Sequence, residues 1–146
     1  MGNNNYFRNG RTYEAALLYQ LYGQFYAVQS QYTEAVPWFE KALATEKMPR
    51  IGAQEVRFQL AQTYFMIGKY ENVIALLDEF IRVGERYKYP VSARVNLLMS
   101  YSHGRLEQYE PSYFHIKQAN NKSDKPQLDW IESVSYTHLT LPTIAI

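Results

Sequence analysis

The sequence predicts an all-α protein made of antiparallel helical hairpins. Apolar residues recur with the period of a helix, one pattern occurs three times along the chain, and the segments between helices are polar or carry glycine. One tyrosine of the pattern recurs at intervals of 38 and 37 residues (64 − 26 and 101 − 64), at Tyr26, Tyr64 and Tyr101. A second recurs at intervals of 38 and 39 residues (70 − 32 and 109 − 70), at Tyr32, Tyr70 and Tyr109. Two independent markers therefore agree on the period.

The apolar spacing assigns two helices to each repeat. In the first repeat one helix face is marked by Leu18, Tyr22, Phe25 and Gln29, and the next by Tyr32, Val36, Phe39 and Leu43. In the second repeat the corresponding faces are marked by Phe58, Leu60, Tyr64 and Ile67, then by Tyr70, Ile74, Leu77 and Ile81. Turns are predicted at 29–31, at 67–69 and, in a longer form, at 103–108. Turns this short place the two helices of a repeat antiparallel.

Small residues indicate where helices approach closely. Gly23 and Ala61 lie on first helices, and Ala35 and Ala42 lie on a second helix. Bulky residues such as Phe39 are expected to fill the space beside them. A single hairpin cannot bury both of its faces, so successive hairpins are expected to stack.

These positions resemble the signature of the tetratricopeptide repeat. The first unit matches at Tyr22, Gly23, Tyr26, Tyr32, Ala35, Phe39 and Ala42. The second matches at Leu60, Ala61, Tyr64, Gly68, Tyr70 and Leu77, but has Val73 and Phe80 where the family prefers small residues. The third matches at Leu97, Tyr101, Tyr109 and Ala119, needs about two extra turn residues, and has Leu98 at the small position. The resemblance implies a right-handed solenoid of hairpins that binds a protein or peptide on its concave face.

The resemblance covers residues 12–132. It divides them into units of about 12–48, 50–88 and 90–122, with the start of a fourth at 125–132. Residues 1–11 are expected to be a disordered N-terminal segment. The fourth unit begins an amphipathic helix with Leu128, Trp130 and Ile131 that is not completed, so we expect an exposed apolar end that favours self-association.

The last residues, 133–146, break the helical pattern. The stretch VSYTHLTLPT, from Val134 to Thr143, resembles one reading frame of the transposon end and adapter used to prepare sequencing libraries. We interpret 133–146 as a non-native tail, with native coding expected to end near Glu132 and the chain expected to be a fragment of a longer protein.

A finer resemblance concerns the stretch QLAQTYFMIGKYENVIALLDEFI, with its bulky Phe80, and the later KPQLDW. Both are similar to tetratricopeptide proteins that accompany TonB energy-transduction systems in Gram-negative bacteria. This resemblance implies a bacterial protein of the periplasm or cell envelope, favoured over the cytoplasm, that assembles or couples a membrane complex.

Composition argues against several other classes of function. With 15 basic and 14 acidic residues the formal charge is +1, too small to attract nucleic acid or an anionic membrane. No apolar run approaches the roughly 20 residues that span a bilayer, so direct membrane insertion is not expected. The absence of cysteine excludes thiolate metal sites. The histidines at 103 and 115 lack the neighbours of a metal or catalytic motif, so neither enzyme activity nor a cofactor is expected.

The expected binding surface lies on the first helix of each repeat, because the family resemblance implies that the first helices line the concave face. The candidate residues are Gln20 and Gln24 in unit one, Phe58, Gln59, Gln62, Phe65 and Met66 in unit two, and Asn96 and Met99 in unit three. Amides can pair with the backbone of an extended peptide while Phe and Met cover its side chains. The alternatives are that the aromatic and Met side chains only pack between helices, and that the array is a structural spacer without a groove of its own.

Overall fold

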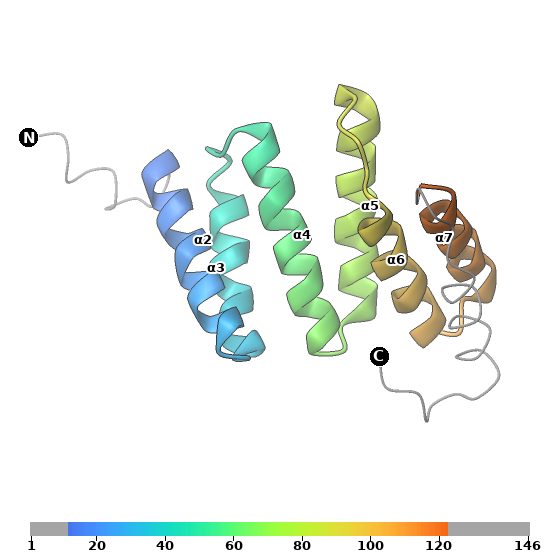
Figure 1. The fold of residues 1–146 in the computed structure, drawn as a ribbon. Coiled ribbons are helices and arrows are strands. Elements are labelled where there is room, and N and C mark those ends of the chain that lie inside the picture. The colour runs from blue at the N-terminus through green and yellow to red at the C-terminus, as the bar shows by residue number, and fades with distance from the viewer. Residues whose placement is uncertain (1–11, 123–146) are drawn as a thin grey trace, which may run out of the picture. The chain divides into compact units, whose positions relative to one another are not determined.

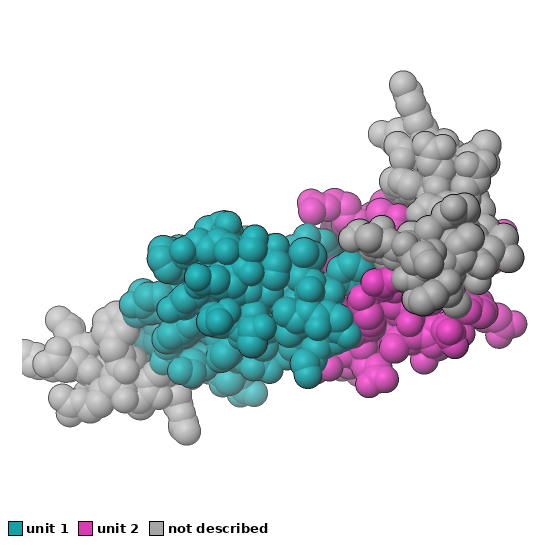
Figure 2. Space-filling view, turned by 90° about the horizontal axis from the view of Figure 1, so that it is seen from below, with its two compact units in different colours: residues 1–69 teal, residues 70–146 magenta. Residues whose placement is uncertain are grey.

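The computed structural model describes residues 12–122, which are helical apart from short connections. The chain divides into two compact units, residues 1–69 and 70–146, and each is described below by itself (Figure 2). The boundary falls in the turn of the second predicted repeat. The predicted N-terminal segment 1–11, the start of a fourth unit at 125–132 and the tail at 133–146 all lie outside the described residues.

Residues 12–122 contain six α-helices and no strand (Figure 1). Unit 1 holds α2 (Tyr13–Val28), α3 (Tyr32–Ala44) and α4 (Arg50–Met66). Unit 2 holds α5 (Tyr70–Tyr87), α6 (Ala93–Arg105) and α7 (Tyr109–Asn121). The all-α fold class predicted from the sequence is therefore confirmed. In unit 1 α3 packs against both α2 and α4, and in unit 2 α6 packs against both α5 and α7.

The two ends of α2 follow ordinary capping chemistry. α2 begins after Thr12, whose Oγ1 accepts a hydrogen bond from the backbone N–H of Ala15 at 3.1 Å. α2 closes with a Schellman motif, in which the N–H of Gln31 donates to the carbonyl of Tyr26 and the N–H of Ser30 to that of Ala27, both at 2.9 Å. Ser30 has a φ of 60°, in the left-handed region that this motif requires.

The same closing motif ends α4 and α6, and it corrects the predicted third turn. The backbone N–H of Lys69 donates to Tyr64, and that of Gln108 donates to His103, both at 2.9 Å. The turn of the third repeat is therefore as short as the others, and the prediction of a longer turn over 103–108 was wrong. His103, not Tyr101, corresponds to Tyr26 and Tyr64 in the helix.

The corrected register also identifies the small residue of the third repeat. In each repeat the small residue lies nine positions before the tyrosine that begins the second helix. These positions hold Gly23, Ala61 and Ser100. Ser100 is fully buried. The predicted assignment of Leu98 to this position was two residues out because it relied on matching Tyr101 to the other tyrosines.

Unit 1 is held together by small residues and one large ring. Ala15 and Ala16 on α2, with Ala35 and Ala42 on α3, have almost no exposed surface. The ring of Phe39 from α3 lies directly over Gly23. At the other side of α3, the hydroxyl of Tyr64 on α4 donates to Oε2 of Glu40 at 2.7 Å.

Unit 2 joins α6 and α7 through two buried serines. The hydroxyl of Ser100 donates to the carbonyl of Ser112 at 2.7 Å, and the hydroxyl of Ser112 donates to the carbonyl of Ser100 at 2.8 Å. Met99 and Ile116 fill the space around them without exposed surface. The reciprocal hydrogen bonds satisfy both hydroxyls, which an apolar interior requires.

Candidate binding pocket

The three helices of unit 1 enclose a pocket of about 260 Å³. All three helices contribute to its lining. α2 supplies Gln24, Ala27 and Val28, α3 supplies Tyr32 and Phe39, and the C-terminal half of α4 supplies Gln59, Gln62, Thr63 and Met66. Four of the residues predicted for partner binding lie in this lining, namely Gln24, Gln59, Gln62 and Met66. The volume suits one or two side chains of a ligand rather than a whole small molecule.

The pocket combines an apolar surface with amide groups. Phe39 is almost fully buried, whereas Met66 and Val28 are exposed. The side-chain amides of Gln24 and Gln62 make no hydrogen bond to another described residue, so each offers both a donor and an acceptor to a ligand. No Asp, Glu, Lys or Arg is among the described residues of the lining, so the pocket is uncharged.

Gln20 and Gln59 form a pair that holds the pocket wall. The Nε2 of Gln20 on α2 donates to Oε1 of Gln59 on α4 at 3.1 Å. Gln20 is only 8% exposed, so its amide serves the protein interior. The prediction made Gln20 a partner-binding residue, whereas the structure gives it the geometry of a positioning residue for Gln59.

The two predicted aromatic residues on α4 lie outside this lining. Phe58 and Phe65 are both half-buried, and both make contacts within the protein. Five residues line the pocket but were absent from the predicted set, namely Ala27, Val28, Tyr32, Phe39 and Thr63. The sequence held a signal for Thr63, because Gln59, Gln62, Thr63 and Met66 follow the three- and four-residue spacing of one helix face.

The predicted residues of the third repeat are buried in unit 2. Met99 has no exposed surface, and Asn96 is 4% exposed. The Nδ2 of Asn96 donates to Nδ1 of His115 at 3.1 Å, and its Oδ1 accepts a hydrogen bond from Nζ of Lys122 at 2.5 Å. Both ends of the Asn96 amide are thus occupied within the unit, and Met99 has no surface to offer a partner. We therefore leave both residues out of the binding site proposed below.

Asn96 and His115 belong to a second pocket of about 500 Å³ in unit 2, walled by residues such as Ile81, Pro90 and Phe114. The imidazole of His115 stacks on that of His103, with ring centroids 5.6 Å apart and planes 7° from parallel. Burial lowers the pKa of His115 to about 4, helped by the nearby His103 and Lys122. His115 is therefore neutral at pH 7 and accepts the Asn96 hydrogen bond through Nδ1.

Among residues 12–122, no helix is both long and apolar enough to cross a membrane. Within the same residues, no group of three or more histidine, aspartate or glutamate side chains is placed to share a metal ion.

Comparison with solved structures identifies the architecture. The chain is similar to the "N-terminal domain of stress-induced protein-1 (STI-1) from C. elegans", a tetratricopeptide-repeat domain, with a TM-score of 0.68. The match covers 86% of this chain and 95% of the other, at 12% sequence identity. No protein-family model matches the chain, and no curated protein sequence matches it. The fold is therefore a tetratricopeptide-like helical repeat, as the sequence resemblance implied.

Proposed function

We propose that the protein is an interaction module that binds an extended peptide segment of a protein partner in the unit 1 pocket, and that it has no catalytic activity of its own. The proposal rests on the pocket itself, in which the amides of Gln24 and Gln62, which bond to no other described residue, share the lining with an apolar surface. The uncharged lining favours a peptide with a neutral apolar side chain at its centre over an acidic or phosphorylated one.

The chemistry of the lining defines the expected ligand. The side chains of Met66 and Val28 would cover an aliphatic or aromatic group of the peptide, and Phe39 would form the floor. The amides of Gln24 and Gln62 would pair with the peptide backbone, whose N–H and C=O groups need partners when water is excluded. Gln59 would be oriented for the same purpose by its hydrogen bond to Gln20.

The test is a selection from a random peptide library displayed on phage, with the full chain immobilised. We expect enriched peptides to share an apolar residue and to bind the purified protein with shifts of the backbone amide NMR signals around Gln24 and Gln62. A Gln24→Leu/Gln62→Leu variant should lose the binding and keep its helical circular dichroism. The matched control, Gln31→Leu/Gln108→Leu, changes two exposed amides that do not line the pocket and should bind normally.

Two outcomes would reject the assignment. Equal binding by the pocket variant and the control would place the peptide elsewhere on the protein. Failure of the library to enrich any peptide would favour the alternative in which the repeats act only as a structural spacer.

The finer proposal concerns the setting in which the module works. We propose a Gram-negative cell-envelope complex of the TonB type, supported by the resemblance of QLAQTYFMIGKYENVIALLDEFI and KPQLDW to the proteins that accompany such systems. Sequencing the source DNA across the codons for Glu132 and Val134 tests it, because the recovered reading frame and its neighbouring genes either encode such a system or do not. The same sequence decides whether residues 133–146 are native.

A further inference from the structure

We infer that the unit 2 pocket, of about 500 Å³, binds a small zwitterion with an apolar side chain, of the class of a free amino acid or a dipeptide. Lys122 would hold the carboxylate of this ligand, and Glu85 would hold its ammonium group. The site lies in a different unit from the peptide pocket proposed above and does not depend on it.

Gly84 allows the connection between α5 and α6 to form one wall of this pocket. The backbone N–H of Tyr89 donates to the carbonyl of Gly84 at 2.9 Å, and Lys88 has a φ of 58°, so the chain turns back on the end of α5. A Cβ built on Gly84 would lie 2.9 Å from Cγ2 of Val91 and 3.1 Å from the carbonyl oxygen of Tyr89. Because Gly84 has no side chain, residues 89–91 can lie directly against α5.

Much of the pocket surface is apolar. Ile81 of α5, Pro90 and Val91 of the connection, and Phe114 of α7 all line it. Phe114 is 57% exposed, so a large part of its ring is open to a ligand. The pocket volume falls within the range of small-molecule sites, roughly 300–1,000 Å³. The unit 2 pocket can therefore accept a whole small molecule with an apolar group.

A chain of side chains holds the ammonium group of Lys122 at the pocket. Its Nζ donates to Oδ1 of Asn96 at 2.5 Å, and Nδ2 of Asn96 donates to Nδ1 of His115 at 3.1 Å. The ring of His115 is itself stacked on that of His103. An ammonium group has three donors, and the Asn96 hydrogen bond uses one of them. Two donors therefore remain for the carboxylate of a ligand.

Glu85 supplies the opposite charge from α5. Its carboxylate lines the same pocket and makes no hydrogen bond or ion pair with another described residue. Partial burial lowers the pKa of Lys122, and the negative charge of Glu85 acts in the opposite direction. The two groups therefore interact electrostatically without contact, and a ligand that carries one charge of each sign can join them.

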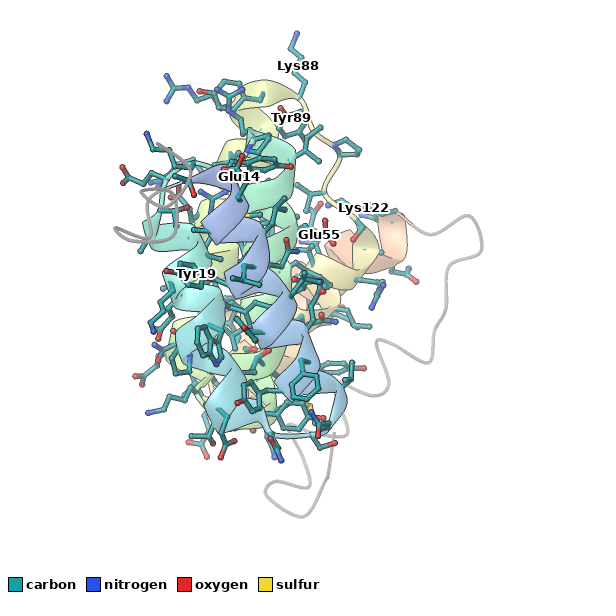
Figure 3. The ribbon with its side chains drawn as sticks, turned by 90° about the vertical axis from the view of Figure 1, so that its left-hand side faces the viewer. Glu14, Tyr19, Glu55, Lys88, Tyr89 and Lys122 are labelled. Carbon is teal, nitrogen blue, oxygen red and sulfur yellow. The ribbon has the colours of Figure 1, made fainter. Side chains whose placement is uncertain are left out.

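The other ionisable residues of the lining do not change this balance. Lys88 belongs to the lining, but Figure 3 shows its side chain extending away from the end of α5, beyond the labelled Tyr89. His115 is neutral at pH 7, as described above. One positive and one negative group thus serve the described pocket, which favours a zwitterion over a ligand with a net charge.

The experiment is an NMR titration of the full chain with four probes. L-phenylalanine and the dipeptide Leu-Phe are the zwitterions, whereas 3-phenylpropionate and 2-phenylethylamine keep the ring and carry only the carboxylate or only the ammonium group. We expect the zwitterions to shift the backbone amide signals around Gly84, Asn96 and Gln118. Each single-charge probe should bind about tenfold more weakly, because one hydrogen bond to a charged group is lost. The tighter of the two zwitterions identifies the source of the ligand.

Variants of the two charged residues assign the contacts. Glu85→Gln should bind the zwitterion no more tightly than 3-phenylpropionate, and Lys122→Met no more tightly than 2-phenylethylamine. The matched controls are Glu71→Gln on α5 and Lys117→Met on α7, which remove exposed charges outside the pocket lining and should bind as the native chain does. All four variants should keep their helical circular dichroism.

The variant Gln24→Leu/Gln62→Leu separates this inference from the proposed function. It should bind the zwitterion normally, because both of its changes lie in unit 1. Loss of zwitterion binding in that variant would place the ligand in the unit 1 pocket instead.

Three further results would overturn the inference. The first is the absence of any signal shift in unit 2 with either zwitterion at millimolar concentration. The second is equal binding of the zwitterions and the single-charge probes to the native chain. The third is an equal loss of affinity in the pocket variants and in their matched controls.

Discussion

The ring of Phe39 occupies the place where Gly23 would carry a side chain. A Cβ built on Gly23 would lie 2.6 Å from Cε1 of Phe39 and 2.7 Å from Cδ1, well inside van der Waals contact. This one relationship sets the approach of α2 and α3, because only glycine leaves room for the ring. It also explains in physical terms why the repeat has a small residue at this position.

Gly23→Ala should therefore destabilise the protein. The alanine gains about 1 kcal/mol of helix propensity, but overpacking against the buried Phe39 costs about 1–3 kcal/mol, so we expect a net loss of up to about 2 kcal/mol. Urea denaturation followed by circular dichroism measures it. Gly52→Ala is the control, because its Cβ would meet nothing nearer than Cε of Met48 at 3.6 Å, and it should stabilise the protein. Equal effects of the two substitutions would contradict the packing argument.

The serine pair of unit 2 makes a separate stability prediction. Ser112→Ala removes a hydroxyl that donates to the Ser100 carbonyl across the two helices, and should cost about 1 kcal/mol. Ser102 is an equally buried serine whose hydroxyl donates to the carbonyl of Leu98 in its own helix. Ser102→Ala should cost less, because no contact between helices is lost. A larger loss for Ser102→Ala in the same denaturation assay would argue against the role of the pair.

Stability should fall in mild acid because of His115. Its pKa is about 4 in the folded protein against 6.5 when exposed, so the unfolded chain binds the proton more readily. The contribution of neutral His115 to the free energy of unfolding is complete above pH 6.5 and is lost as the pH falls from 6.5 to 4. Since the side chain is only partly buried, we expect the loss to be about 1–2 kcal/mol.

The variant His115→Gln isolates this effect. The urea midpoint of each protein is measured as a function of pH. Between pH 6.5 and 4 the midpoint of the native chain should fall more steeply than that of the variant, because the carboxylates titrate in both proteins and His115 in only one. Parallel pH profiles for the two proteins would show that His115 does not carry the acid sensitivity.

The hydrogen bond between Tyr64 and Glu40 should contribute to the packing of α3 against α4. Tyr64→Phe removes the donor and keeps the ring, so we expect a loss of about 1 kcal/mol. Glu40→Gln retains an acceptor and should cost less. If Glu40→Gln proves the more costly of the two, the carboxylate has another role in unit 1.

The sequence by itself determined the helical class, the two helices of each of the first two repeats and the first two turns. It did so because helix periodicity, glycine and polar turn residues act locally, through the geometry of neighbouring residues. The third turn was misplaced because Tyr101 resembled the repeat tyrosines, while the true equivalent, His103, is revealed only by its carbonyl accepting the hydrogen bond from Gln108.

Only the tertiary structure decided which side chains face one another. The sequence brought Gln20, Gln24 and Gln62 into one candidate set with Asn96 and Met99, since all lie on first helices. Packing then separated them: Gln20 pairs with Gln59, Asn96 pairs with His115, and Gln24 and Gln62 are left facing a pocket. The sequence likewise shows that α2 carries apolar residues on its outer face. It does not show that they are exposed, because burial depends on neighbours that lie far away in the chain.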